Sequence, residues 1–413
     1  MNKNKEIFSV SIFNDKDRIL LNNSDIKTCY FIEDIYSFVK TGKIVFIDSI
    51  GIVEFLPLVG GEKITIEYSS EGESKEYEFV IYKISKIEED ISTKRKYIEL
   101  LFVESIHYAL HTYNHSLSFK ENSKYSDIIK HISSNHLGIN DFVKWENSKE
   151  TLLNFYTGLK TPASNLKWLM NRCSGKDSNE PGYLFYSNTF KTERSFNFVT
   201  LETLLKNTKL IGLYTDQYTF QNTNEYYINN IISYKINMVD NASLNSLSNN
   251  IYLGYDIHRK KIIRREYNYN DSLKHFTVLG KFSLFDKNKI KLSTLRQTLT
   301  GDCHGENTET ILDNLYFSNW IKQYCLQQTI DIIVKGHNKR YAGGMIEIIW
   351  PSGNKDSTNN KNMMGKYLIK SITHMFTTQE AEQYLQKIIL IKNGYQDTDS
   401  NYLVEIDTSK RNM

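Results

Sequence analysis

The sequence predicts an α+β fold that is mainly β, with two similar antiparallel β-barrels and two smaller inserted α/β domains. The first indication is a three-strand pattern that occurs near the start of the chain and again near its end. The second is composition, because 28 Tyr and 21 Phe against 4 Pro favour strands over interrupted structure. The third is a change to helical spacing between these two regions, which predicts separate α-containing domains.

The repeated pattern begins with a glycine pair and continues through three strand-like segments. In the first copy these segments are residues 60–66, 77–84 and 97–103, and in the second they are residues 343–348, 366–372 and 384–391. Similar residue types match Gly61, Tyr77 and Tyr97 of the first copy with Gly344, Tyr367 and Tyr384 of the second. Self-similarity at this separation indicates a duplicated β module, since solenoid repeats are only about 20–50 residues long. A chain built from two like barrels is expected to serve in an assembly more readily than as an enzyme.

Residues 1–108 are predicted to form the first barrel. Residues 8–13 and 64–68 alternate between apolar and polar side chains, and a polar turn follows the second of these segments. Alternation of this kind buries one face of a strand in a core and leaves the other for solvent or a neighbour.

Residues 109–206 are predicted to form a separate α+β domain. One amphipathic helix follows Ser123 and is closed by Gly138, and a second runs from Pro162 to Gly175. A hairpin is expected after the helices, from segments 183–186 and 195–199.

The second barrel is predicted to be discontinuous and to occupy residues 207–250 and 320–395. Its first strand is expected at residues 231–238, so residues 251–319 form an insertion within the barrel. An apolar stripe from Ile311 to Cys325 predicts a helix that leads out of the insertion. Residues 396–413 are polar and are predicted to be a C-terminal tail.

Composition argues against several classes of protein. With 413 residues, of which 40% are hydrophobic, the chain is expected to be globular and to divide into about two to four domains. The 51 basic and 48 acidic side chains leave a net charge of only +3, which disfavours a nucleic-acid-binding protein. The densest basic cluster is interpreted as a solvated strand face or a subunit contact; it consists of Arg259, Lys260, Lys261, Arg264 and Arg265.

Cysteine spacing and the apolar stretches predict a protein made in a cytoplasm. Cys29, Cys173, Cys303 and Cys325 are scattered without CxxC spacing, which favours a reducing compartment over a disulfide framework. The apolar stretches are too short or too interrupted for a signal peptide or a membrane span.

Three histidines have the spacing that one face of a helix would use for a metal ion. His107, His111 and His115 are each four residues apart. A catalytic zinc site also needs a nearby carboxylate base, as in the HExxH motif, and none stands in this run. The histidines are therefore interpreted as ordinary residues at a domain junction.

Two further segments bring reactive residue types together without a recognisable catalytic pattern. Asp302, Cys303, His304 and Glu306 are neighbours in sequence, but adjacent residues rarely converge on one reacting atom. Residues 336–344 are rich in glycine, but they lack the phosphate-loop pattern and lead into a strand. The sequence thus assigns no catalytic, cofactor-binding or metal-binding residues, and it predicts that the protein is not an enzyme.

The order of several stretches carries a resemblance to a known family. They are residues 60–66, 79–84 and 98–105, then 116–119 with 126–132, then 162–172 with 182–186, and finally 365–374 with the closing strand to Gly394. Together they resemble the central tail hub protein of contractile-tailed bacteriophages. The spike-complex proteins of type VI secretion and of contractile bacteriocins share this hub architecture. Residues 251–310 match the pattern least.

The resemblance implies a homotrimer in which each chain contributes two barrels of the tube type. Three chains would present six similar units around one axis and would join a hexameric tail tube, or its initiator protein, to a trimeric central spike in the virion baseplate. The inserted domains would contact surrounding baseplate proteins, and the genome would pass through the lumen without specific binding. Assembly would take place in the host cytoplasm without a membrane, and the spike is expected to be a separate protein.

Two other functions remain open at this point. One is a virion-associated enzyme that degrades the cell wall, with residues 302–306 or the histidine run as its site. The other is a carbohydrate-binding β protein, which the many tyrosines favour weakly. A monomer that hydrolyses cell walls and loses this activity on His304→Ala would favour the enzyme, whereas a ring of three chains would favour the hub.

Overall fold

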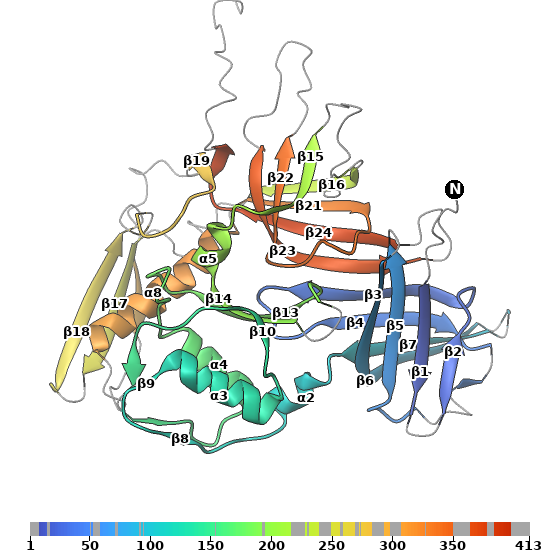
Figure 1. Cartoon of the computed structure of the whole chain (residues 1–413), viewed down its shortest axis with the longest axis horizontal. Coiled ribbons are helices and arrows are strands. Elements are labelled where there is room, and N and C mark those ends of the chain that lie inside the picture. Colours follow the sequence, from blue (N-terminus) through green and yellow to red (C-terminus); the bar gives the residue numbers. More distant parts are fainter. Residues whose placement is uncertain are drawn as a thin grey trace, which may run out of the picture.

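The computed structural model is mostly β, and thirteen of its strands form one large sheet (Figure 1). The structure describes residues 8–397 except 15–16, 50, 53–57, 71–72, 91, 94, 153, 192–194, 216–227, 229–230, 239–248, 257–258, 269–271, 273, 283–292, 298–306, 327, 350–363 and 378–383. Every strand pair in the large sheet is antiparallel except the pair of β15 and β22. The predicted mainly β fold is therefore confirmed.

The first strand set curves around a single core. Its strands are β1 (Phe8–Phe13), β2 (Arg18–Leu21), β3 (Ile26–Asp34), β4 (Thr41–Ile47), β5 (Lys63–Ser70), β6 (Glu73–Asp90) and β7 (Arg95–Val103). They follow the order β3-β4-β7-β6-β5-β1-β2. Buried side chains from all seven strands belong to one hydrophobic cluster, which requires the sheet to bend around it.

The second strand set has the same strand order as the first. Its strands are β15 (Leu210–Thr215), β16 (Ile231–Met238), β21 (Gln328–Lys335), β22 (Met345–Ile349), β23 (Gly365–Phe376) and β24 (Tyr384–Lys392). The order β16-β21-β24-β23-β22 corresponds strand by strand to β3-β4-β7-β6-β5. The strand predicted at residues 231–238 is β16. β16 and β21 correspond to β3 and β4, which follow each other directly in the first set, whereas a long segment separates β16 from β21.

Backbone hydrogen bonds equate individual residues of the two sets. Ile81 of β6 exchanges two bonds of 2.8 Å, one with the amide of Gly61 and one with the carbonyl of the next residue. Ile369 of β23 does the same with Gly343 and its successor, at 3.0 and 2.9 Å. Ile369 is thus the counterpart of Ile81, and Gly343 is the counterpart of Gly61.

The two sets also share their β-bulges. The register of β6 against β7 shifts directly after Ile81, and the register of β23 against β24 shifts directly after Ile369. In the same way β3 shifts against β4 after Ile26, and β16 shifts against β21 after Ile231. Because a bulge re-aims every side chain that follows it, two shared bulges are strong support for duplication.

Each set has an ion pair at the same position, but the basic and the acidic residue have exchanged places. In the first set Lys43 lies 2.6 Å from Glu99, and at the equivalent positions of the second set Asp331 lies 3.8 Å from Lys387. The repeated pattern in the sequence therefore corresponds to a duplicated unit of structure.

The equivalent glycines allow a matched substitution. Gly61 and Gly343 have φ of +98° and +84°, a conformation that costs an L-residue roughly 1–2 kcal/mol. We expect Gly61→Ala to cost about this strain alone, since its Cβ would meet nothing within 4 Å. The Cβ of Gly343→Ala would overlap the hydroxyl of Tyr186, which should add about 1–3 kcal/mol of overpacking. Urea denaturation of both variants checks this, and equal losses would contradict it.

The two sets are joined by a ladder between β3 and β23. This ladder is antiparallel and runs from the pair Cys29–Phe376 to the pair Asp34–Ser371. It occupies the edge of β3 that closure of the first set would need. In the part of the chain that the structure describes, no ladder closes either set into a barrel, and the sheet continues from one set into the other.

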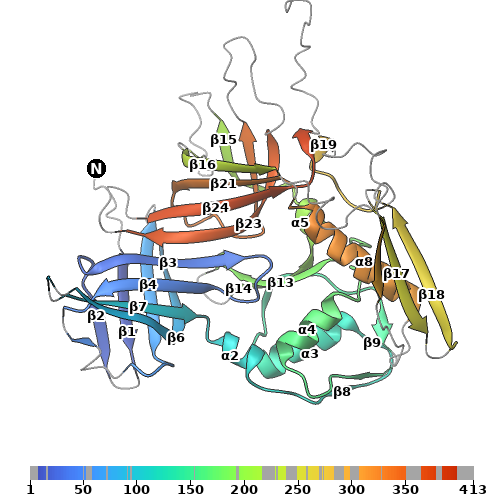
Figure 2. The same ribbon diagram turned by 180° about the vertical axis from the view of Figure 1, so that it is seen from behind.

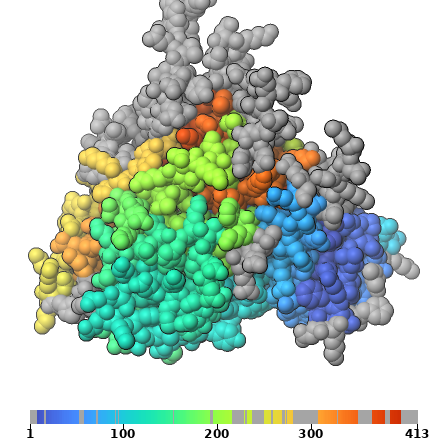
Figure 3. All heavy atoms as spheres, in the orientation of Figure 1, coloured from blue at the N-terminus to red at the C-terminus, as the bar shows by residue number. Residues whose placement is uncertain are grey.

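The α+β region lies beside the first strand set (Figure 3). Its elements are α2 (Ile106–His111), β8 (Ser118–Phe119), β9 (Ser123–Lys124), α3 (Tyr125–Leu137), β10 (Phe142–Trp145), β11 (Thr151–Leu152), β12 (Phe155–Tyr156), α4 (Pro162–Met170), β13 (Tyr183–Asn188), β14 (Ser195–Thr200) and α5 (Leu201–Leu205). The predicted helices and hairpin are present. Gly138 ends α3 in the left-handed conformation, and α4 ends at Met170, earlier than the predicted Gly175.

The segment between β16 and β21 contains a small sheet covered by a helix (Figure 2). Its elements are β17 (Asn249–Asp256), β18 (Lys261–Asn268), β19 (Gly280–Phe282), β20 (Ser293–Gln297) and α8 (Thr308–Tyr324). The sheet order is β18-β17-β20, and Tyr267 of β18 stacks on Tyr316 of α8 at 4.0 Å. β19 pairs with β25 (Tyr395–Asp397), which includes the first two residues of the predicted tail. No helix among the described residues is long and apolar enough to cross a membrane.

Candidate functional site

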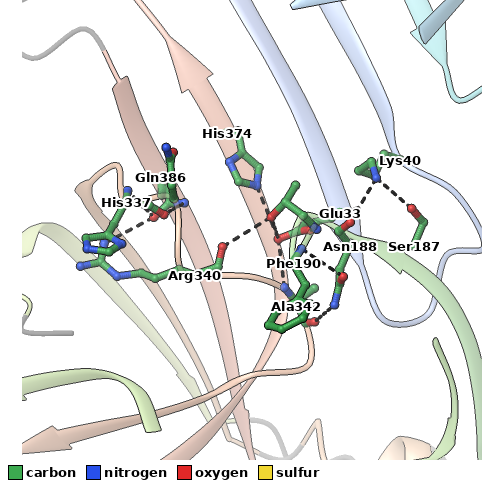
Figure 4. A network of polar contacts seen from close by, with 12 residues as sticks. Glu33, Lys40, Ser187, Asn188, Phe190, His337, Arg340, Ala342, His374 and Gln386 are labelled. Carbon is green, nitrogen blue, oxygen red and sulfur yellow. Dashed lines mark hydrogen bonds and ion pairs between the residues drawn. The ribbon is translucent and has the colours of Figure 1, made fainter. Parts of the chain in front are cut away.

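A cluster of buried polar side chains lies where the two strand sets meet the β13–β14 hairpin (Figure 4). We call this cluster the polar junction. Its members are all buried, and they are Glu33, Lys40, Lys75, Glu104, Ser187, Asn188, Thr189, His337, Arg340, His374 and Gln386. Buried polar groups persist only where hydrogen bonds or opposite charges replace the water that they lose.

Glu33 is the acceptor at the centre of the polar junction, and its side chain is 0% exposed. The carboxylate accepts hydrogen bonds from the amide of Thr189 at 2.6 Å and from its hydroxyl at 3.2 Å. It also accepts one from the amide of Ala342 at 2.9 Å. One side chain on β3 therefore holds the end of the β13–β14 hairpin and the loop that leads into β22.

Two lysines balance the buried carboxylates. Lys40 forms an ion pair with Glu104 at 2.7 Å and donates to the hydroxyl of Ser187 at 2.8 Å. Lys75 donates to the carbonyl oxygens of Thr189 at 2.7 Å and Asn338 at 2.8 Å. Burial lowers the pKa of Lys75, whereas the charge of Glu33 opposes that effect.

His374 connects the polar junction to an aromatic core. Its Nδ1 lies 2.7 Å from the hydroxyl of Tyr384, and its Nε2 lies 3.5 Å from Glu33. The ring stacks on Phe31 with 4.4 Å between centroids. Burial lowers the pKa of His374, with Lys75 and Lys40 acting in the same direction and Glu33 against them. With His374 neutral, the two glutamates oppose the charges of the two lysines, and Arg340 adds one further positive charge to the polar junction.

The lowered pKa of His374 predicts that acid destabilises the protein. A histidine of the unfolded chain takes up a proton near pH 6.5, while the buried ring of the folded chain resists it. The unfolded state then binds more protons, so stability falls as pH drops below about 6.5, by at most about 1.4 kcal/mol per pH unit for this group. Urea midpoints at pH 8 and pH 5 check this. We expect His374→Gln to lose less stability on acidification than the wild type, and an equal loss would contradict it.

The geometry suits mechanical fixation more than chemistry. Gln386 donates to the carbonyl of His337 at 3.0 Å and accepts from its amide at 3.2 Å, and Arg340 donates to the carbonyl of Lys335 at 2.8 Å. Most of these donors bond to backbone atoms of neighbouring elements. The polar junction therefore fixes how the two strand sets and the hairpin lie relative to one another.

The three histidines singled out in the sequence do not converge. His107 and His111 lie on α2 with their ring centroids 4.6 Å apart, whereas His115 lies against His136 of α3 at 4.0 Å. Within the described ranges, no group of three or more His, Cys, Asp or Glu side chains is arranged to hold a metal ion.

The other candidate segments have different outcomes. Residues 302–306 lie outside the described residues. Residues 336–344 lead into β22, as predicted, and contribute His337 and Arg340 to the polar junction. In the basic cluster Arg264 pairs with Glu266 of the same strand and Arg265 pairs with Glu309 of α8, so part of the charge of the cluster is neutralised.

Comparison with known proteins shows what this fold is. No protein-family model matches the chain, and no curated protein matches it in sequence. Among solved structures, a tail protein from Neisseria meningitidis MC58 matches with a TM-score of 0.59 and 11% identity, over 94% of this chain and 97% of its own. The chain has the fold of phage tail proteins.

A second tail protein has the same relationship to this chain. The 43 kDa tail protein of prophage MuSo2 from Shewanella oneidensis matches with a TM-score of 0.55 and 11% identity, over 93% of this chain and 98% of its own. A component of the type VI secretion system of E. coli matches with a TM-score of 0.49 and 10% identity, over 90% and 76%. The predicted resemblance to tail proteins is confirmed at the level of the fold.

Proposed function

We propose that this protein is a structural component of a phage tail baseplate, a trimeric hub ring with pseudo-sixfold symmetry that joins a hexameric tail tube to a trimeric central spike. The observation that carries this proposal is the duplication. Each chain holds two strand sets with the same order and the same bulges. A trimer then presents six equivalent strand sets to a sixfold partner. To a threefold partner it presents three identical chains. Heterologous contacts close such a ring when the rotation closes.

In this proposal the two strand sets act as the two barrels of tube type, formed by residues 1–108 and by residues 207–250 with 320–395. Two hydrophobic clusters support it, one formed mainly by the first set with Phe376 and Tyr384 of the second, and one within the second set. Residues 109–206 and 251–319 lie on the outside of the ring, where they contact surrounding baseplate proteins. The genome passes through the lumen without specific binding.

The polar junction has a definite role in such a ring. In a ring of three chains, the angle between the two sets of one chain and the angle between sets of neighbouring chains together make a third of a turn, so the first angle decides whether the ring closes. A buried network of ion pairs and hydrogen bonds specifies one arrangement, because another arrangement leaves polar groups unpaired away from water. We propose that the polar junction sets this angle.

The proposal is tested by the mass of the assembly in solution. We expect a species of three 48.3 kDa chains, alone or with the spike protein present, and a ring with an axial channel by electron microscopy. Addition of the tube or tube-initiator protein should give a complex that holds three hub chains. A chain that stays monomeric with both partners present would sink the hub proposal.

The enzyme alternative is tested in parallel with cell walls as substrate. The hub proposal expects no hydrolysis by the wild-type chain. Hydrolysis that disappears in His304→Ala would instead assign residues 302–306 to an active site.

A further inference from the structure

The ladder between β3 and β23 is a contact between the two copies of the duplicated unit inside one chain. It contains six residue pairs, from Cys29–Phe376 to Asp34–Ser371. The ion pair of Lys370 with Asp34, at 2.7 Å, lies at the end of the ladder. The edge strand of the first copy thus already pairs with the segment of the second copy that follows its bulge.

The counterparts of these two strands are both edge strands. β16 corresponds to β3, and among the strands that the structure describes it lies at the end of the sheet and pairs only with β21. β6 corresponds to β23. Its ladder with β5 ends at Val80, so beyond Ile81 it pairs only with β7 among the described strands. The pairing of β3 with β23 inside the chain therefore has a possible equivalent, which is a pairing of β16 with β6. In this arrangement a single chain does not make that second pairing with itself.

Both edges expose apolar side chains, and both also carry exposed charged side chains. On β16, Ile232 is 51% exposed and Tyr234 is 59% exposed. On β6 beyond Ile81, Tyr82 is 46% exposed and Ile87 is 51% exposed. Exposed apolar edge strands invite pairing with another chain unless the assembly covers them. Lys235 is an exposed base on β16, and the outer part of β6 carries Glu88, Glu89 and Asp90 together with Lys83 and Lys86, of which Lys86 pairs with Glu88.

We propose that β16 of one subunit pairs antiparallel with the outer part of β6, residues 83–90, of the next subunit. The occupant of each edge is thus a second copy of this chain, and the inference rests on the trimeric ring proposed above. The contact between chains repeats the contact of β3 with β23 inside a chain. Intrachain and interchain ladders then alternate around the ring, so that six strand sets are linked through six like contacts.

Another edge serves as a control because it lacks this equivalence. β2 lies at the opposite end of the large sheet and exposes Leu20 at 60%. Among the described strands of the second set none corresponds to β2, so the ladder between the copies predicts no partner for it. Exposure alone would make Leu20 as good a partner as Ile87, whereas the duplication selects β6.

Disulfide trapping between full-length chains tests the pairing. In a Cys303→Ser background the remaining cysteines, Cys29, Cys173 and Cys325, are buried. Lys235→Cys is combined in trans with Lys86→Cys, Ile87→Cys or Glu88→Cys, because a second bulge after Ile84 makes a short scan necessary to find the register. We expect at least one mixture to shift from a one-chain to a two-chain band on a non-reducing gel. Each cysteine variant alone should stay a single chain. In a heterologous contact a residue of one chain does not meet the same residue of the neighbouring chain.

The outcomes separate the two proposals. A trimer in solution that traps Leu20→Cys with Lys235→Cys, or traps none of the three mixtures, overturns the strand pairing and leaves the hub proposal standing. A chain that is monomeric even with its partners overturns both.

Charge exchange gives a second measurement without cysteines. Lys235→Glu should reduce the trimer fraction and Glu88→Lys in the same chain should restore it, and an unchanged trimer in Lys235→Glu with no trapping contradicts the pairing.

Discussion

Glu33→Ala is expected to lower the free energy of unfolding by about 3–5 kcal/mol, which is typical when one partner of a buried charge network is removed. The substitution takes the acceptor from the amides of Thr189 and Ala342. It also leaves Lys40 and Lys75 with Glu104 as the only opposing charge in the polar junction. Urea denaturation measures the loss as a lower midpoint at an unchanged slope.

A surface carboxylate on the same sheet is the matched control. Glu78 of β6 pairs with Lys63, and both side chains are 49% exposed. Such a pair contributes about 0–1 kcal/mol, so Glu78→Ala should change the midpoint little. Glu33→Gln keeps the shape of the side chain and separates the loss of charge from the loss of packing. A loss below about 1 kcal/mol for Glu33→Ala would show that the polar junction does not hold the two sets together.

The strands and helices could be predicted because their signals are local. Alternation at residues 8–13 predicted β1, and helical spacing closed by Gly138 predicted α3. The interruption of the second set was also visible, since strand character at residues 231–238 preceded a long segment of different pattern.

The residue alignment of the two copies was less accurate. Similar residue types suggested that Gly61 matches Gly344 and that Tyr77 matches Tyr367. The backbone bonds instead equate Gly61 with Gly343, and Tyr367 with Phe79. Bulges and hydrogen bonds set the true equivalence, and they leave no mark in the side-chain pattern of a short strand.

The polar junction was missed for a related reason. Glu33 stands among alternating residues, and its partners Thr189 and Ala342 are 156 and 309 positions away. A single sequence does not show that such residues meet. A signal was present, because Lys75 and Gln386 fall in phase with buried residues of β6 and β24. Polar residues on an inward face point to a buried network, although they do not name its partners.

Closure of the strand sets is also a non-local property. The sequence predicted two separate barrels. However, the edge of β3 could pair either with β2, at the other end of its own set, or with β23 of the second set. In the structure it pairs with β23, and only the three-dimensional arrangement decides this. In the ring proposed above, closure would come from neighbouring sets.

Trp320→Ala is expected to cost about 3–5 kcal/mol, the usual loss when a buried tryptophan is truncated. Trp320 of α8 is 2% exposed and stacks on Tyr324 at 4.5 Å and on Phe276 at 5.6 Å. Its cluster includes Leu184 of the hairpin and Leu368 of the second strand set. One side chain therefore anchors the inserted sheet to two other parts of the molecule. Urea denaturation measures the total loss.

Amide exchange distinguishes this anchoring role from a general loss of stability. In Trp320→Ala the amides of β17 and β18 should exchange faster than those of β6 and β7, because the helix that covers the small sheet loses a buried side chain of the cluster that it shares with the rest of the molecule. Ile262 of β18 is 66% exposed, and Ile262→Ala should stay within about 0.5 kcal/mol of the wild type. Uniform acceleration across the chain would mean that the insertion unfolds together with the strand sets. Selective acceleration would mean that α8 holds a unit that folds on the duplicated sheet.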